Sequence, residues 1–328
     1  MKQSVAARPN ILSVVADAFL RRREASILVV ALALIIYFQT SNDVFLSPEN
    51  IATVAQYAAP WAIIAAGEVM LLICGEIDLS VGQVFALAPF IVNFAFQAGI
   101  PLEAGVIIAL AASALVGLIN GLVTVLLRVP SFVTTLGTLF LLNGFTLTIT
   151  QGFPVQTPGS GTFSLILGHG TYAPILWAIG IMIAVQVVLT STRWGLHTIA
   201  TGGNLLGSSE SGINVRRIKV GNFMLTSVLG GFAGILTAVR ITSMDPLAGG
   251  TDVMFRAVAA AVIGGTALAG GSGTVAGAFL GAVVLATIFD GFTLLGVSAF
   301  TFDMILGAAI LLAMIINVYL ARLRRAGK

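Results

Sequence analysis

Residues 102–127 read LEAGVIIALAASALVGLINGLVTVLL and carry one formal charge, at Glu103. A single helix needs about 20 consecutive apolar residues to cross the hydrocarbon core of a bilayer, and this stretch is long enough. Ordinary soluble proteins place charged residues far more densely than this. The stretch therefore predicts a transmembrane helix.

The whole chain has the same character. Hydrophobic residues make up 58% of the 328 residues and charged residues 9%, against roughly 45–50% and about 25% in soluble proteins. This composition excludes a water-soluble enzyme and a disordered chain. The net charge of +3 is not gathered into a basic stripe, which argues against nucleic acid as a partner. A polytopic membrane protein remains.

Apolar runs recur along the chain without the sustained alternation that marks an outer-membrane barrel. Helices satisfy their own backbone hydrogen bonds inside lipid. We therefore expect an all-α polytopic membrane protein with about ten transmembrane or half-spanning helices. The candidate runs are 25–41, 51–73, 79–98, 102–127, 132–150, 174–190, 218–241, 256–271, 274–296 and 300–320.

Basic residues set the orientation, because Lys and Arg accumulate in cytoplasmic segments. Both termini are predicted to be cytoplasmic, with a segment 1–24, a transmembrane domain 25–320 and a tail 321–328. The uncharged segment 151–173 is then external. The predicted cytoplasmic segments carry Arg21, Arg22, Arg23, Arg128, Arg193, Arg216, Arg217, Lys219, Arg322, Arg324, Arg325 and Lys328. The opposite side carries Asp43, Glu49, Glu103, Asp245 and Asp252, with Arg240 and Arg256 at span edges.

Few residues could support catalysis or metal binding. Cys74 is the single cysteine, so an internal disulfide and a cysteine metal cluster are excluded. His169 and His197 stand in separate segments, and we expect no metal site. The chain has no G-x-x-x-x-G-K-[ST] phosphate loop and no Ser-His-Asp set. We therefore expect a protein that is not an enzyme and holds no cofactor of its own.

Glycines recur at helical spacing, which lets helix backbones approach closely in a membrane bundle. Examples are Gly117 with Gly121, Gly230 with Gly234, and Gly277 with Gly281. We interpret them as packing residues.

The longest predicted cytoplasmic loop, 191–217, reads STRWGLHTIATGGNLLGSSESGINVRR. Asn204 is a good N-cap residue and predicts a short helix. Leu205, Leu206 and Ile213 would form its apolar face, and Gly203 and Gly212 would permit bends at its ends. Such a helix suits docking to a soluble partner, while a connector held on anionic lipid by its basic residues is the alternative.

Four segments together resemble the permease subunits of bacterial ABC importers for monosaccharides of the ribose, xylose, arabinose and galactoside type. They run in family order over about residues 50–318. The segments are GEIDLSVG at 75–82, PSFVTTLGT at 130–138, GGN at 202–204 with SGIN at 211–214, and VIGGTALAGGSG at 262–273 with LLGV at 294–297.

This resemblance implies that loop 191–217 is a coupling segment docking on a cytoplasmic ATPase, which would bind the ATP. It also implies a second permease chain, a periplasmic sugar-binding protein and a place in the bacterial inner membrane. The expected coupling residues are Gly202, Gly203, Asn204, Leu205, Leu206, Ser211, Gly212, Ile213, Arg216 and Arg217.

Polar residues inside predicted spans are candidates for the translocation pathway, because carboxylates there are costly to bury. Hydrogen bonding between helices is the alternative role for each one. Glu76 and Asp78 are expected at a membrane edge, as caps or loop residues. The pathway candidates are Glu68, Asn120, Asn143, Thr146, Asp290 and Asp303.

Two functions follow from these residues. The first is the permease subunit of an ATP-driven importer that forms the pathway for a monosaccharide. The second is an ion-coupled secondary transporter of a small neutral polar solute, which often uses broken helices and related halves. Dependence of uptake on ATP separates them.

Overall fold

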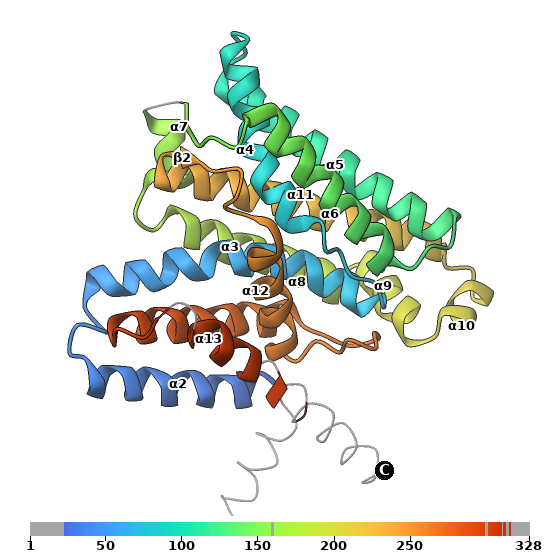
Figure 1. The fold of residues 1–328 in the computed structure, drawn as a ribbon. Helices are drawn as coiled ribbons and strands as arrows, with labels where there is room; N and C mark the ends of the chain where they lie inside the picture. Colours follow the sequence, from blue (N-terminus) through green and yellow to red (C-terminus); the bar gives the residue numbers. More distant parts are fainter. Residues whose placement is uncertain (1–22, 159–160, 299–300, 310, 313–314, 316–328) are drawn as a thin grey trace, which may run out of the picture.

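A computed structural model describes residues 23–158, 161–298, 301–309, 311–312 and 315. The architecture is a helical bundle (Figure 1), which confirms the predicted all-α class. Most of the predicted segment 1–24, the tail 321–328 and the end of the run 300–320 lie outside the described residues. The helices are α2 (Arg23–Ser41), α3 (Pro48–Ile73), α4 (Val81–Gln97), α5 (Leu102–Leu126), α6 (Ser131–Thr150), α7 (Thr162–Ser164), a π-helical turn η1 (Leu165–His169), α8 (Ala173–Ser191), α9 (Arg193–Gly203), α10 (Leu205–Glu210), α11 (Val215–Ile241), α12 (Gly250–Ile263) and α13 (Val275–Leu294), followed by helical residues 301–309.

Six of the described helices are long and apolar enough to cross a membrane: α3, α5, α6, α8, α11 and α13. Helix α4 and the apolar part of α2 are shorter. The predicted run 256–271 is wrong at both ends, since α12 begins at Gly250 and ends at Ile263. Residues after Ile263 turn back through Gly265, Gly270 and Gly271, all with positive φ.

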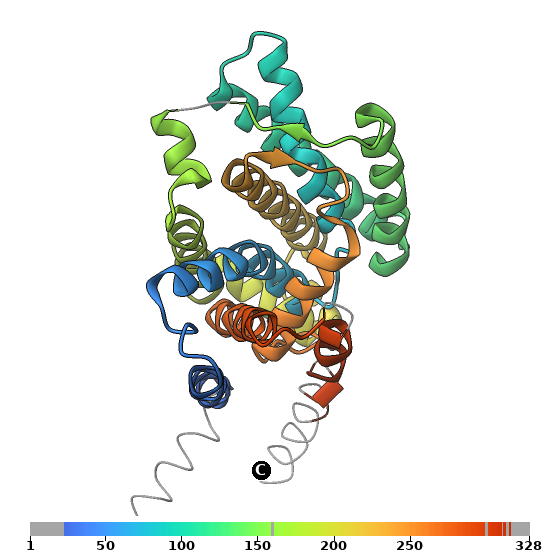
Figure 2. The same ribbon diagram turned by 60° about the vertical axis from the view of Figure 1, so that its left-hand side comes forward.

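Helices α3 and α11 form the centre of the bundle. Helix α11 packs against α3, α4 and α5, while α13 and α12 cover the other side of α3 (Figure 2). A methyl group at Gly117 or Gly234 would overlap a carbonyl oxygen of the neighbouring helix, from Phe223 and Phe85 respectively. The predicted packing role of these glycines is therefore confirmed.

The two ends of the bundle differ. Helices α9 and α10 lie at one end, and α7 with the short strands lies at the other (Figure 1). Strand β1 (Val155–Gln156) pairs antiparallel with β2 (Ser243–Met244). The segment 151–173 and the segment after α11 are thus on the same side, as predicted.

Two helices begin inside the bundle. The connection 74–80 returns from the end of α3 into the interior, where α4 starts. Gly82 of α4 packs so tightly against α12 that a methyl group on it would overlap the backbone of Gly250, and a methyl group on Gly249 would overlap the carbonyl oxygen of Gly82. The starts of α4 and α12 therefore meet within the bundle.

Candidate functional site

The connection between α3 and α4 contains a fully buried carboxylate. Asp78 has no exposed surface, and its Oδ1 accepts hydrogen bonds from the backbone N–H of Ser80 at 2.8 Å and from the Ser80 hydroxyl at 2.6 Å. The Ser227 hydroxyl of α11 donates to Oδ2 at 3.3 Å. A buried carboxylate needs such donors, because burial without them is costly.

Asn120 of α5 joins this group. Its Nδ2 donates to the Ser80 hydroxyl at 2.9 Å and lies 3.5 Å from Asp78 Oδ1, while its Oδ1 accepts from the Thr138 hydroxyl of α6 at 2.6 Å. We call Asp78, Ser80, Asn120, Thr138 and Ser227 the polar cluster. It links the broken connection to α5, α6 and α11.

Helix α6 also holds the backbone of the connection. The hydroxyl of Ser131 accepts from the N–H of Ile77 at 3.3 Å, and that of Thr135 accepts from the N–H of Leu79 at 3.0 Å. An extended segment buried among helices has no ladder of its own, so side chains must satisfy its N–H groups. The hydroxyls of α6 supply this.

The polar cluster contains one predicted pathway residue, Asn120, and one carboxylate that was expected at a membrane edge. Asp78 is buried instead, because the chain folds back after α3. Two features of the sequence indicate members of the cluster: an Asp and a Ser two residues apart at 78 and 80, and a single Asn at position 120 within an apolar run. Their hydrogen bonds to one another could not be derived from spacing.

Glu68 of α3 is fully buried, and neither of its carboxylate oxygens has a hydrogen-bond partner among the described residues. Thr146 of α6 is also fully buried with an unpartnered hydroxyl in that part of the chain. Asn143 is half-buried. Asp290 accepts a hydrogen bond of 2.7 Å from Asn50 Nδ2, which ties α13 to the start of α3. Glu68 lies close to Asp78 of the polar cluster, whereas Asp290 lies at the opposite end of α3, so the structure does not gather all the predicted pathway residues at one site.

Asp303 is exposed on the helical residues 301–309. Of the predicted pathway carboxylates, it is therefore the one on the outside of the described chain, whereas Glu68 and Asp290 are buried.

The predicted coupling segment forms α9 and α10. The side chain of Asn204 accepts a hydrogen bond from the N–H of Gly207 at 2.9 Å, so Asn204 is the N-cap of α10 as predicted. Gly212 has a φ of 83° and turns the chain after this helix. Gly203 is the last residue of α9 and has no positive φ, whereas Gly202 lies against the carbonyl of Ile73, where a methyl group would overlap it.

The apolar side chains of α10 point outward. Leu205 is 49% exposed and Leu206 71%. The prediction that Ile213 belongs to the face of this helix is wrong, because α10 ends at Glu210 and the chain turns at Gly212; Ile213 follows that turn and is half-buried. All three side chains border a groove of 1070 Å³ between α10 and the α5–α6 connection, which we call the α10 groove. It is lined by Glu76, Thr124, Val125, Arg128, Val129, Pro130, Leu205, Leu206, Ser209, Glu210, Gly212, Ile213, Asn214, Val215, Arg216 and Lys219.

An ion pair crosses the inner wall of the α10 groove. Lys219, in the second turn of α11, pairs with Glu76, and both side chains are largely buried. Glu76 precedes Asp78 by two residues. The start of α11 is therefore tied to the broken connection through Glu76 and, further along the helix, through Ser227.

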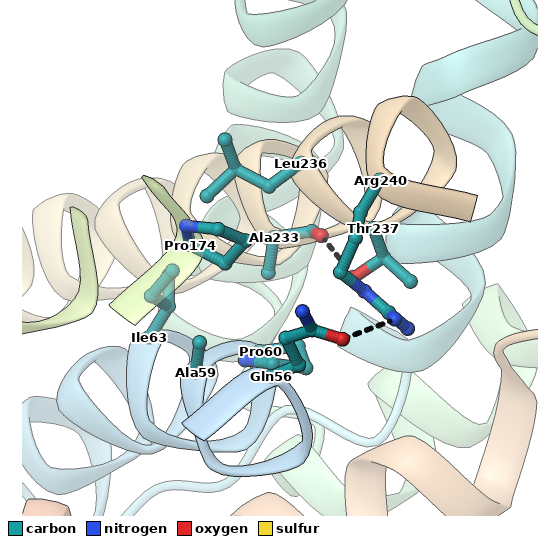
Figure 3. Close-up of a pocket in the computed structure, with 9 residues that line it drawn as sticks. All are labelled: Gln56, Ala59, Pro60, Ile63, Pro174, Ala233, Leu236, Thr237 and Arg240. Carbon is teal, nitrogen blue, oxygen red and sulfur yellow. Dashed lines mark hydrogen bonds between the residues drawn. The ribbon is translucent and has the colours of Figure 1, made fainter. Parts of the chain in front are cut away.

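At the opposite end of α3 and α11, the Arg240 guanidinium donates to Gln56 Oε1 at 3.0 Å (Figure 3). Gln56 Nε2 lies 3.4 Å from the carbonyl oxygen of Thr171, just before α8. This polar contact closes a narrow pocket bordered by Pro60 and Pro174 (Figure 3). It fixes the β2 end of the bundle, where α3, α8 and α11 meet.

Long apolar helices around two helix starts inside the bundle, with a buried polar cluster and the α10 groove at one end, are typical of a multi-pass membrane transport protein. Residues 50–314 match the family described as the permease component of the branched-chain amino acid transport system. The chain belongs to this permease family and is a transport subunit.

Relatives cover almost the whole chain. The xylose/arabinose import permease protein XylH of Sulfolobus acidocaldarius is 38% identical over 95% of this chain and 88% of its own length. The ribose import permease proteins RbsC of Escherichia coli K12 and Bacillus subtilis are 35% and 33% identical, over 90% and 87% of this chain and 93% and 89% of their own. No solved structure matches.

Proposed function

We propose that this chain is the transmembrane permease subunit of an ATP-driven importer and forms the pathway for a monosaccharide. The observation that carries this proposal is the similarity to sugar import permeases along nearly the full length. All three relatives named above are import permeases for pentoses. None is an ion-coupled transporter, so ATP-driven import is favoured over the secondary-transport alternative.

ATP hydrolysis is assigned to a separate cytoplasmic subunit that docks at the α10 groove. Exposed Leu205 and Leu206 support this, because exposed apolar side chains beside a concave surface suit a helix-in-groove contact. Arg216 and Arg217 are exposed at the start of α11 and would add charge complementarity. The full proposed coupling set is Gly202, Gly203, Asn204, Leu205, Leu206, Ser211, Gly212, Ile213, Arg216 and Arg217.

The remaining partners are a second permease chain, identical or homologous, and a periplasmic sugar-binding protein that delivers the substrate. A multi-pass position in a bacterial inner membrane follows from these partners. The proposed pathway residues are Glu68, Asn120, Asn143, Thr146, Asp290 and Asp303. Asn120 is fully buried and hydrogen-bonded to Ser80 and Thr138, which favours the alternative role of hydrogen bonding between helices for this residue.

Co-purification with the ATPase and uptake in proteoliposomes test this function. Uptake of labelled D-xylose or D-ribose should require internal ATP and persist when ion gradients are collapsed. Uptake driven by a gradient without ATP would support the secondary transporter instead. A complex that holds a single permease chain and still transports would contradict the proposal that a second permease chain is required.

The coupling role has its own test. Ile213→Asp places a charge against the partner surface, where an unpaired buried charge is costly, so insertion should be normal while ATPase association is lost. The matched control is Ile108→Asp, expected to impair insertion because Ile108 is exposed on the apolar helix α5. Full uptake by Ile213→Asp at wild-type abundance would make the loop a lipid-anchored connector.

A further inference from the structure

Asp252 and Arg256 lie at a depth where charged side chains are rare. The sequence places Asp252 in an outer loop and Arg256 at a span edge, but α12 starts against Gly82 in the first turn of α4. The same part of α4 packs on Gly230 and Gly234, near the middle of α11. The first turns of α12 are therefore close to the centre of the bilayer.

The carboxylate of Asp252 is on the outside of the chain at this depth. Its side chain is 58% exposed, and Thr251 and Phe255 are exposed beside it. A charge at the centre of a lipid-facing helix is costly, and such charges face the protein interior or a water-filled cavity. This face of α12 is therefore not a lipid-facing surface.

Arg256 holds the carboxylate in place. Its Nη2 donates to Asp252 Oδ1 at 2.8 Å, and the Arg256 side chain is only 13% exposed. The guanidinium carbon lies 5.0 Å from the ring centroid of Trp61, 4.9 Å from that of Phe289 and 5.3 Å from that of Phe302. Cation–π contacts of this kind fix the guanidinium and compensate part of its lost hydration.

The pair presents its acceptor outward and keeps its cation inside. The Arg256 Nε is buried without a hydrogen-bond partner within the described residues, whereas the Asp252 carboxylate is 58% exposed. The pair as a whole is neutral, and its exposed part is a hydrogen-bond acceptor. Such an acceptor matches a neutral solute with hydroxyl groups, each of which can donate a hydrogen bond.

We propose that Asp252 and Arg256 form a contact site for a polyhydroxylated, uncharged substrate in the wall of the translocation pathway. The site deepens the proposed function and rests on it. Asp252 accepts from the hydroxyls of the passing sugar, and the buried Arg256 is a positioning residue that holds Asp252. The face of Thr251, Asp252 and Phe255 is then lined by water during transport.

Thiol labelling in the assembled transporter tests the exposure to water. Asp252→Cys should react with a charged, lipid-insoluble thiol reagent during turnover, and D-xylose or D-ribose should slow the reaction. The native Cys74 is 3% exposed and gives little background. The control Phe140→Cys, at a position 66% exposed on the apolar surface of α6, should not react. An unreactive Asp252→Cys would overturn the proposal, because lipid or the second permease chain would then cover this face.

Transport kinetics test the contact itself. Asp252→Asn keeps the side-chain shape but loses the charge-assisted acceptor, and should raise the KM for uptake at least tenfold while ATPase association stays at the wild-type level. The same change at Asp43→Asn, at an exposed position between α2 and α3, should leave the KM within twofold. An unchanged KM in Asp252→Asn, with wild-type uptake dependent on ATP, would refute the site alone. Loss of ATP dependence in the wild type would refute the proposed function instead.

Discussion

Gly82 is where two helix starts come closest together. A methyl group there would overlap the carbonyl oxygen of Gly250, and backbone atoms cannot move aside as a flexible side chain can. Gly137 of α6 offers the contrast, because a methyl group there would meet nothing within 4 Å. The same substitution at the two glycines therefore separates packing from intrinsic helix propensity.

We predict that Gly82→Ala lowers thermal stability in detergent, with a cost of about 1–3 kcal/mol as expected for overpacking. Gly137→Ala should be neutral or slightly stabilising, since Ala favours helix over Gly by roughly 1 kcal/mol. Melting temperatures of the purified variants measure both. Equal effects at the two positions would mean that α4 and α12 do not pack as described.

Asp78 organises the polar cluster through one carboxylate. We predict that Asp78→Ala destabilises the protein by about 1–3 kcal/mol, because it leaves the buried hydrogen-bond donors of Ser80 and Ser227 without an acceptor. Asp43, exposed between α2 and α3, is the control, and Asp43→Ala should be silent. The comparison is made by thermal unfolding, and a silent Asp78→Ala would place this residue outside the bundle interior.

Helix α11 connects the coupling segment to the interior. Its second turn contacts Glu76 through Lys219, and Ser227 reaches Asp78. If α10 docks on an ATPase as we propose, α11 would pass a displacement of α10 to the broken connection at both contacts, because a helix moves nearly as a rigid body. Glu76 and Lys219 would then be positioning residues between the α10 groove and the polar cluster.

We predict that Glu76→Lys and Lys219→Glu each reduce uptake at least tenfold, because each leaves two like charges facing one another in a largely buried place. The double variant restores the pair in reverse and should recover most of the uptake. ATPase association, measured by co-purification, should be retained throughout. Failure of the double variant to recover uptake, at normal abundance, would limit the pair to a local structural role.

The sequence predicts the long apolar helices and α4 well, and the bounds of α12 poorly. The runs 102–127 and 79–98 match α5 (Leu102–Leu126) and α4 (Val81–Gln97), since a long apolar pattern needs no tertiary information. The run 256–271 fails because Ala, Leu and Gly after Ile263 are as apolar as the helix itself. There the chain turns at Gly265, which has positive φ, and contacts with α3 and α9 hold the loop. Hydropathy does not report such contacts.

The candidate site divides in the same way. Local signals located α10, because the capping Asn204 and the turn at Gly212 act within a few residues. Asp78 was misplaced, because its burial depends on α5, α6 and α11 surrounding it. Asn120 was identified as polar in an apolar run, but its partners across three helices could not be derived from the chain alone.

The distribution of charge over the whole bundle sets its orientation. Arg193, Arg216 and Arg217 lie at the α10 end, while Glu49 and Glu103 lie near the opposite end, in agreement with a cytoplasmic α10. The described helices thus have one consistent polarity across the membrane.

We predict that a reporter inserted at the turn of Gln151 and Gly152 is exported, while one inserted at Gly212 stays in the cytoplasm. Both turns are exposed and have positive φ, so insertion there should leave the helices intact. Alkaline phosphatase activity and fluorescence of the two fusions report the sides. If both reporters were found on the same side of the membrane, the predicted topology would be wrong.

Helix α12 has a consequence for biogenesis. It has 14 residues, about 21 Å at the helical rise, which is shorter than a hydrocarbon core of about 30 Å, and it carries Asp252 and Arg256. Such a segment partitions poorly from the translocon into lipid by itself. We therefore expect α12 to enter the membrane stably only after later segments are made. These are α13, which packs against α12, and residues 301–309, whose Phe302 contacts Arg256. Nascent chains arrested before residue 275 should therefore leave α12 outside the membrane, and chains extended past residue 309 should draw it in.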